Sequence, residues 1–181
     1  MTVQEIFSEL SAHCVRGMMV HDQMADYYDF LSLRGYKRCH EYHFKKESAN
    51  YRKLHRYYLN HYNGLIGEEQ IDNPDIIPPG WYRYTRFDVE PNTKRNAIKD
   101  GFSKWVEWEK ETKSKLESAC NTLYEMSEVS AAMFVKEMLK DVNCELKEAQ
   151  RKHIELMSVE YDLSYVYAEQ KRIHDKYKKM L

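Results

Sequence analysis

The sequence predicts an all-α protein: an antiparallel bundle of four long helices with a long crossover between the second and the third. Two observations support this fold. Only six Gly and four Pro occur among 181 residues, and every Pro falls between Pro74 and Pro91, so helix-breaking residues are nearly absent elsewhere. Outside that stretch, apolar residues recur at spacings of three and four, which stacks them on one helix face. With 43% hydrophobic residues, we expect one domain over residues 1–181.

The first two helices should form an antiparallel hairpin. The first covers about residues 3–33, and Gly35 ends it because glycine readily adopts the left-handed conformation that a helix stop often needs. The second covers about residues 36–63 and stops at Asn63 and Gly64.

The crossover covers residues 64–92. Its Pro residues, among them Pro74, Pro78 and Pro79, forbid a continuous helix because proline lacks the backbone donor and clashes with the preceding turn. It is rich in aromatic residues, which are Trp81, Tyr82, Tyr84 and Phe87. A solvated linker would be poorer in aromatics, so we expect the crossover to pack along the bundle.

The third helix covers about residues 93–126, with Asn92 or Thr93 as its N-cap, and it ends near Ser127. The fourth covers about residues 130–157. Beyond Ser158 the helix either continues or breaks into a short fifth helix over residues 160–179, and we favour the break.

The bulk composition predicts a cytoplasmic protein outside the membrane. No stretch approaches ~18 uninterrupted apolar residues. The four Cys residues are spread one per predicted helix without a CxxC pair, which favours buried thiols in a reducing compartment. The net charge of −1 gives no global field that would attract nucleic acid.

Four polar residues fall on the apolar stripes of the four long helices. They are His21, Glu47, Glu109 and Glu145. His21 lies fourteen residues before Gly35 and Glu47 twelve after it, while Glu109 and Glu145 each lie eighteen residues from Ser127. A bundle of usual geometry would therefore bring all four toward one interior cross-section. Buried charges are usually paired or bound to a metal.

Three segments make the chain resemble the ferritin-like superfamily. Residues 105–113, Trp-Val-Glu-Trp-Glu-Lys-Glu-Thr-Lys, are similar to the start of a ferritin third helix, in which a Glu that precedes a Lys is an iron ligand. Residues 134–148 are similar to the fourth helix, and residues 47–54 match the helix that carries a Glu-x-x-His ligand pair. Asn50 stands where that His is expected, and Glu148 follows Glu145 at plus three.

This resemblance implies a ferritin-like bundle and a variant metal site. Its candidate ligands are His21, Glu47, Glu109, Glu145 and Glu148, and its metal would be iron or manganese, serving an oxidase or a metal store. Because neither half of the bundle supplies the intact motif, we favour the alternative, a satisfied polar network without metal.

The second helix and the crossover carry most of the candidate binding surface. Its residues are Lys37, Arg38, Lys45, Lys46, Arg52, Lys53, Arg56, Tyr57, Trp81, Arg83 and Arg86. Such cations can contact phosphates, and exposed Tyr rings can stack on bases. The alternative is a solvated face that pairs with acids of neighbouring helices. We expect His40 and His43 to be interface or partly buried residues, since they form no zinc pattern.

The sequence contains no nucleophile motif, no Gly-rich phosphate loop and no HExxH, which argues against conventional hydrolase or kinase chemistry. We rank three functions. The first is a non-enzymatic protein that binds a protein or nucleoprotein partner. The second is a ferritin-like metal oxidase or store, and the third is a structural homo-oligomer. The compact, breaker-poor style also resembles small phage-encoded or mobile-element proteins, some of which inhibit host nucleases such as Cas9, a special case of the first function.

Overall fold

The computed structural model describes residues 1–67, 70–78, 81, 84–86 and 88–181. The described part of the chain contains five α-helices. They are α1 (Val3–Phe30), α2 (Arg34–Tyr62), α3 (Pro91–Glu125), α4 (Val129–Ser158) and α5 (Leu163–Lys178). The predicted fold class, a helical bundle with a short C-terminal helix, is confirmed.

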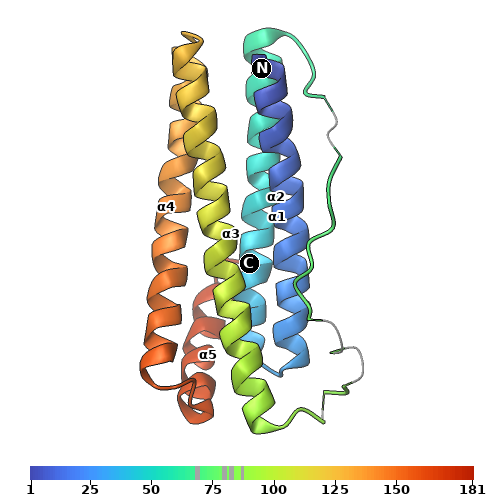
Figure 1. Ribbon diagram of the computed structural model, residues 1–181, viewed down its shortest axis with the longest axis vertical. Coiled ribbons are helices and arrows are strands. Elements are labelled where there is room, and N and C mark those ends of the chain that lie inside the picture. Colours follow the sequence, from blue (N-terminus) through green and yellow to red (C-terminus); the bar gives the residue numbers. More distant parts are fainter. Residues whose placement is uncertain (68–69, 79–80, 82–83, 87) are drawn as a thin grey trace.

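The four long helices form two hairpins that lie side by side (Figure 1). Helix α1 pairs with α2, and α3 pairs with α4. The crossover returns the chain along the outside of the first hairpin, so α2 and α3 run in the same direction (Figure 1). Helix α5 turns back at the end of α4 and packs on α2.

Local sequence signals explain most of the helix ends. Thr2 and Glu5 form a capping box at the start of α1, in which the Thr2 hydroxyl accepts from the Glu5 amide at 3.2 Å. Helix α3 begins at Pro91 and not at residue 93, because proline suits the first helical position, whose amide has no partner in any case. Asn63 caps α2 in the left-handed conformation, with φ of 54°.

The prediction that Gly35 ends the first helix is wrong. Helix α1 stops at Phe30, and Ser32 takes the left-handed conformation in the turn, with φ of 62°. Gly35 lies in the first turn of α2, where its amide donates to Gln170 Oε1 of α5 at 2.8 Å. A Cβ at this position would lie only 1.8 Å from the Gln170 carbonyl oxygen, so the absent side chain lets α5 approach α2 closely.

A buried ion pair adds to the docking of α5. Lys152 of α4 and Glu169 of α5 are both buried, with Nζ 3.5 Å from Oε1. The Tyr36 hydroxyl donates to Glu169 Oε2 at 2.5 Å. Three helices therefore meet at one carboxylate.

The core consists of two apolar clusters. The α5-side cluster includes Met24, Tyr28, Phe102 and Ile173, and the turn-side cluster, near the turn between α3 and α4, includes Phe7, Leu10, Leu123 and Val135. Between them lies a belt of polar residues, which we call the polar belt: His21, His40, His43, Glu47, Glu109 and Glu145. On α4, for example, Val142 belongs to one cluster and Leu146 to the other, with Glu145 between them.

The crossover packs along α1, as its aromatic residues indicate. The ring of Trp81 meets Tyr27 and Phe30 edge-on, at centroid distances of 5.4 and 5.9 Å. Gln23 of α1 donates to Asn73 at 3.1 Å. Of the crossover residues named above, Pro79, Tyr82, Arg83 and Phe87 lie outside the described residues.

Three of the four cysteines are buried as expected, but Cys144 is exposed. Among the described helices, none combines the length and the apolar character that a membrane crossing requires.

Replacing Gly35 with Ala should destabilise the protein by about 2 kcal/mol or more, because the new methyl group displaces the α5 backbone. Helix propensity alone acts in the opposite direction, favouring Ala by about 1 kcal/mol. Urea denaturation followed by circular dichroism measures the change. The exposed neighbour Arg34→Ala serves as control and should stay within about 0.5 kcal/mol of wild type. A Gly35→Ala variant as stable as wild type would contradict the close approach.

Candidate metal centre

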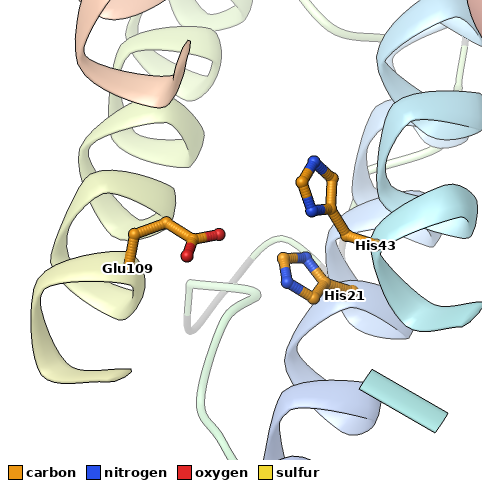
Figure 2. Close-up of side chains that lie close together, drawn as sticks. All are labelled: His21, His43 and Glu109. Atoms are coloured by element: carbon orange, nitrogen blue, oxygen red, sulfur yellow. The ribbon is translucent and has the colours of Figure 1, made fainter. Parts of the chain in front are cut away.

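Three buried side chains from three helices converge in the polar belt. His21 of α1, His43 of α2 and Glu109 of α3 each offer one ligand atom, and these atoms all lie within 4.8 Å of one another. The Glu109 carboxylate points across the space between the hairpins toward the two imidazole rings (Figure 2). All three residues are at most 2% exposed.

Two further carboxylates border this cluster. Glu47 of α2 is 7% exposed and lies near enough to Glu109 to repel it. Gly17 makes room for Glu47, because a Cβ there would lie 2.8 Å from Glu47 Cδ and 2.9 Å from a Trp108 ring carbon. Glu145 of α4 places Oε2 3.9 Å from His43 Nδ1 and forms an ion pair with Lys46.

Neighbouring side chains hold two of the clustered residues in place. Nδ1 of His40 lies 3.1 Å from Nδ1 of His21, so one ring donates to the other. The Trp105 indole donates to Glu109 Oε1 at 2.9 Å. Partners of this kind orient the ligands of a metal and fix the tautomer of a ligand histidine.

Burial keeps the imidazoles neutral. It lowers the pKa of His21 to about 3 and lowers the pKa values of His40 and His43 well below the ordinary value, with the neighbouring histidines adding to the effect on both. A neutral imidazole has a free lone pair, which is the form that binds a metal.

Burial also disfavours the charged carboxylates. It raises the pKa of Glu47 to about 8, with the charge of Glu109 adding to the rise. It raises the pKa of Glu109 to about 7, against the opposing effects of the Trp105 hydrogen bond and of Lys46. Both carboxyls therefore lack a sufficient positive partner among the described groups.

The donor set fits a divalent transition metal. Two imidazole nitrogens and one carboxylate suit iron, manganese or zinc. Metal–ligand bonds of about 2.1 Å require ligand atoms roughly 3.0–3.5 Å apart, so the ligand atoms, which all lie within 4.8 Å of one another, would move closer together around a bound ion. Nε2 of His43 is buried and finds no hydrogen-bond partner among the described residues, which leaves binding capacity unused.

The structure brings together some of the candidate ligands named from sequence. His21 and Glu109 lie in the cluster, and Glu47 and Glu145 border it. Glu148 lies elsewhere: its Oε1 accepts from Lys176 at 3.0 Å and from the Tyr177 hydroxyl at 3.1 Å, so it belongs to the contact between α4 and α5.

The cations of the predicted binding surface fall into two groups, those held in contacts with other residues and those that are exposed. Lys37 and Arg86 both pair with Asp29, at 3.2 and 3.5 Å, and they line a surface cleft together with Arg38. Lys45 donates to the Leu181 carbonyl at 2.9 Å. Within this predicted surface, Arg52, Lys53 and Arg56 are the α2 cations that are exposed and form neither an ion pair nor a hydrogen bond among the described residues.

The aromatic members of that surface are packed. The ring of Tyr57 stacks on both His61 and Phe134, at centroid distances of 3.9 and 4.2 Å, so the expectation that it stacks on bases is not supported. Trp81 is half-buried against α1.

Sequence reasoning missed His43 as a candidate ligand and placed Lys46 on the outer surface. The expectation of partly buried or interface histidines is wrong, since His40 and His43 are 1% and 2% exposed. The available signal was spacing: His43 lies four residues before Glu47, on the same helix face.

Comparison with known proteins shows the fold. No family model matches the chain, and no curated protein matches its sequence. Among solved structures, a humanized archaeal ferritin has a TM-score of 0.79 at 14% identity, over 95% of this chain and 94% of that chain. An engineered closed form of the Archaeoglobus fulgidus ferritin has a TM-score of 0.77 at 14% identity, over 95% and 94%. The open-pore ferritin of the same archaeon has a TM-score of 0.77 at 13% identity, over 95% of both. The chain therefore has the ferritin-like four-helix bundle fold.

The Glu47 carboxyl should make the stability of the chelator-treated protein depend on pH. Its pKa is raised from 4.5 to about 8 in the folded state, so folding retains a proton that the unfolded chain releases, and this contribution to stability falls as the pH rises from 4.5 to 8. Glu47→Gln removes the loss. Between pH 5 and pH 8, the free energy of unfolding of the variant should rise relative to that of wild type by about 1 kcal/mol or more, as measured by urea denaturation in EDTA.

Glu111→Gln is the control for this pH series, because Glu111 is a half-exposed residue paired with Arg16 at 3.0 Å. The difference in free energy of unfolding between Glu111→Gln and wild type should change little from pH 5 to pH 8. A constant difference between Glu47→Gln and wild type would show that Glu47 ionises alike in both states.

Proposed function

We propose that the protein binds divalent iron or manganese in the interior of its helical bundle and serves as a ferritin-like metal-binding oxidase or store. The observation that carries this proposal is the convergence of His21, His43 and Glu109, with one ligand atom from each within 4.8 Å of the others. This favours the second of the three functions ranked from sequence.

The electrostatics support metal binding. Three buried histidines with lowered pKa values have lone pairs to donate, and two buried carboxyls with raised pKa values have only Lys46 as a nearby cation among the described groups, which is not sufficient to offset their burial. A cation in this position would stabilise both carboxylates in their charged form.

The fold and the compartment favour iron or manganese over zinc. The similar solved structures are ferritins, and zinc more often takes tetrahedral sites with Cys or a third His. The cytoplasmic location that we propose from the cysteine pattern is reducing. Bound iron would supply one-electron redox chemistry, while the protein orients the ligands through His40 and Trp105 and excludes bulk water with its two apolar clusters.

The competing interpretation is a polar network without metal. The His21–His40 contact, the Trp105–Glu109 bond and the Lys46–Glu145 ion pair all agree with it. Among the described residues, it leaves Nε2 of His43 without a hydrogen-bond partner and Glu47 without an ion pair. Metal binding accounts for both.

Metal binding is tested by removing and restoring the ion. Chelator-treated protein is incubated anaerobically with Fe²⁺ or Mn²⁺, desalted and analysed for metal by mass spectrometry, and its melting temperature is recorded. We expect retained metal and a higher melting temperature, since a ligand that binds only the folded state stabilises it. His43→Gln and Glu109→Gln should retain less than a tenth of the wild-type metal.

Glu111→Gln is the matched control on α3, because it removes a carboxylate two residues from Glu109 on the outer side of the helix, where Glu111 pairs with Arg16. It should bind metal as wild type does. Folded wild-type protein that retains neither ion, with an unchanged melting temperature, would leave the polar network as the explanation.

A second function, contact with a nucleoprotein or nucleic-acid partner, has support from the exposed cations Arg52, Lys53 and Arg56 on one stretch of α2. The resemblance to phage-encoded inhibitors stays a prediction, as does a structural homo-oligomer. Partner binding and interior metal binding use different surfaces and do not exclude each other.

The cationic stretch is tested by gel shift with RNA and DNA at two salt concentrations. If phosphate contacts carry binding, replacing Arg52, Lys53 and Arg56 with Ala should weaken it and reduce the slope of log affinity against log salt by roughly 2–3. The control replaces the exposed α4 residues Lys136, Lys140 and Lys147, which removes the same charge elsewhere. Equal losses in both triple variants would indicate a general charge effect instead.

A further inference from the structure

Lys46 is a cation that points into the polar belt. It lies on α2 between His43 and Glu47, and its side chain is 29% exposed. Its ammonium group forms an ion pair with Glu145 of α4, on the opposite hairpin. That carboxylate is 13% exposed, and its other oxygen lies 3.9 Å from His43 Nδ1. Lys46 therefore holds a fixed positive charge next to the candidate ligands.

A centre with two metal ions needs the carboxylate that Lys46 holds. In four-helix bundles that bind two ions, each of the four helices contributes a carboxylate. Here α1 contributes His21 in place of a carboxylate, and the carboxylate of α4, Glu145, is bound to an ammonium group. His21, His43 and Glu109 can serve one ion, with Glu47 beside them, but a second ion would have to displace Lys46.

The net charge of the polar belt also favours a single metal ion. Glu47, Glu109 and Glu145 carry three negative charges when ionised, and Lys46 carries one positive charge, so a single divalent ion makes the belt neutral. A second divalent ion would leave two uncompensated positive charges in the buried site with Lys46 in place, which is strongly unfavourable, so it could enter only if Lys46 left.

The charged groups beyond the belt do not alter this balance. Lys176 pairs with Glu148 at 3.0 Å, and Lys152 pairs with Glu169 at 3.5 Å, so the contact between α4 and α5 is neutral by itself.

We infer that Lys46 limits the bundle to one metal ion per chain, with its ammonium group at Glu145 in the position that a second ion would need. This inference rests on the proposed function. Lys46 is a residue that sets metal stoichiometry, and it acts through Glu145.

The test is a count of bound ions with Mn²⁺ as the probe. Wild-type protein should bind one Mn²⁺ per chain and give the hyperfine-split electron paramagnetic resonance signal of an isolated ion. Lys46→Met keeps the aliphatic stem and removes the charge, and it should approach two Mn²⁺ per chain with a spin-coupled signal. The exposed neighbour Lys45→Met is the control and should bind one.

The possible results separate the inference from the proposed function. Two ions in wild type, or one ion in a folded Lys46→Met variant, would overturn the role of Lys46 while leaving metal binding intact. No ion in folded wild type would overturn metal binding itself. If Lys46→Met does not fold, Lys46→Gln, which also removes the charge, gives the count instead: two Mn²⁺ per chain supports the role of Lys46, and one overturns it.

Discussion

The fold depends on accommodating six titratable side chains in its interior. Each of the four long helices contributes at least one of the residues of the polar belt, and transfer of such groups out of water is unfavourable unless hydrogen bonds, counter-charges or a metal compensate. The described contacts compensate part of this cost. Trp105 binds Glu109, His40 binds His21 and Lys46 binds Glu145, but Glu47 and one nitrogen of His43 are left without a comparable partner.

The bundle is predictable from sequence because its signals are local and repeated. Proline confined to one segment and apolar spacing elsewhere define the long helices and the crossover. Gly35 was misplaced because glycine marks both a helix stop and a site of close backbone approach, and only the position of α5 distinguishes the two. The turn instead uses Ser32, a residue with no strong preference for the left-handed conformation.

The interior site was partly predictable for a similar reason. Counting residues from the two turns places His21 level with Glu47, and Glu109 level with Glu145. The structure places His21 and Glu109 in the cluster of candidate ligands and the other two carboxylates beside it. Lys46 was out of reach because it belongs to a basic run, and its inward direction depends on a carboxylate ninety-nine residues away. Glu148 is a candidate ligand from sequence because it follows Glu145 at plus three. Its contact with Lys176 of α5 could not be foreseen, because the docking of α5 leaves no signal near Glu148 in the sequence.

The division of the core into two apolar clusters also bears on how this sequence diverges. A substitution at Leu123 alters packing in the turn-side cluster only, and one at Ile173 alters packing in the α5-side cluster only. Substitutions that compensate one another in packing can therefore accumulate within one cluster without affecting the other, provided that the helices keep their relative positions at the polar belt. A chain built in this way can share the fold of a ferritin over 95% of its length at 14% sequence identity.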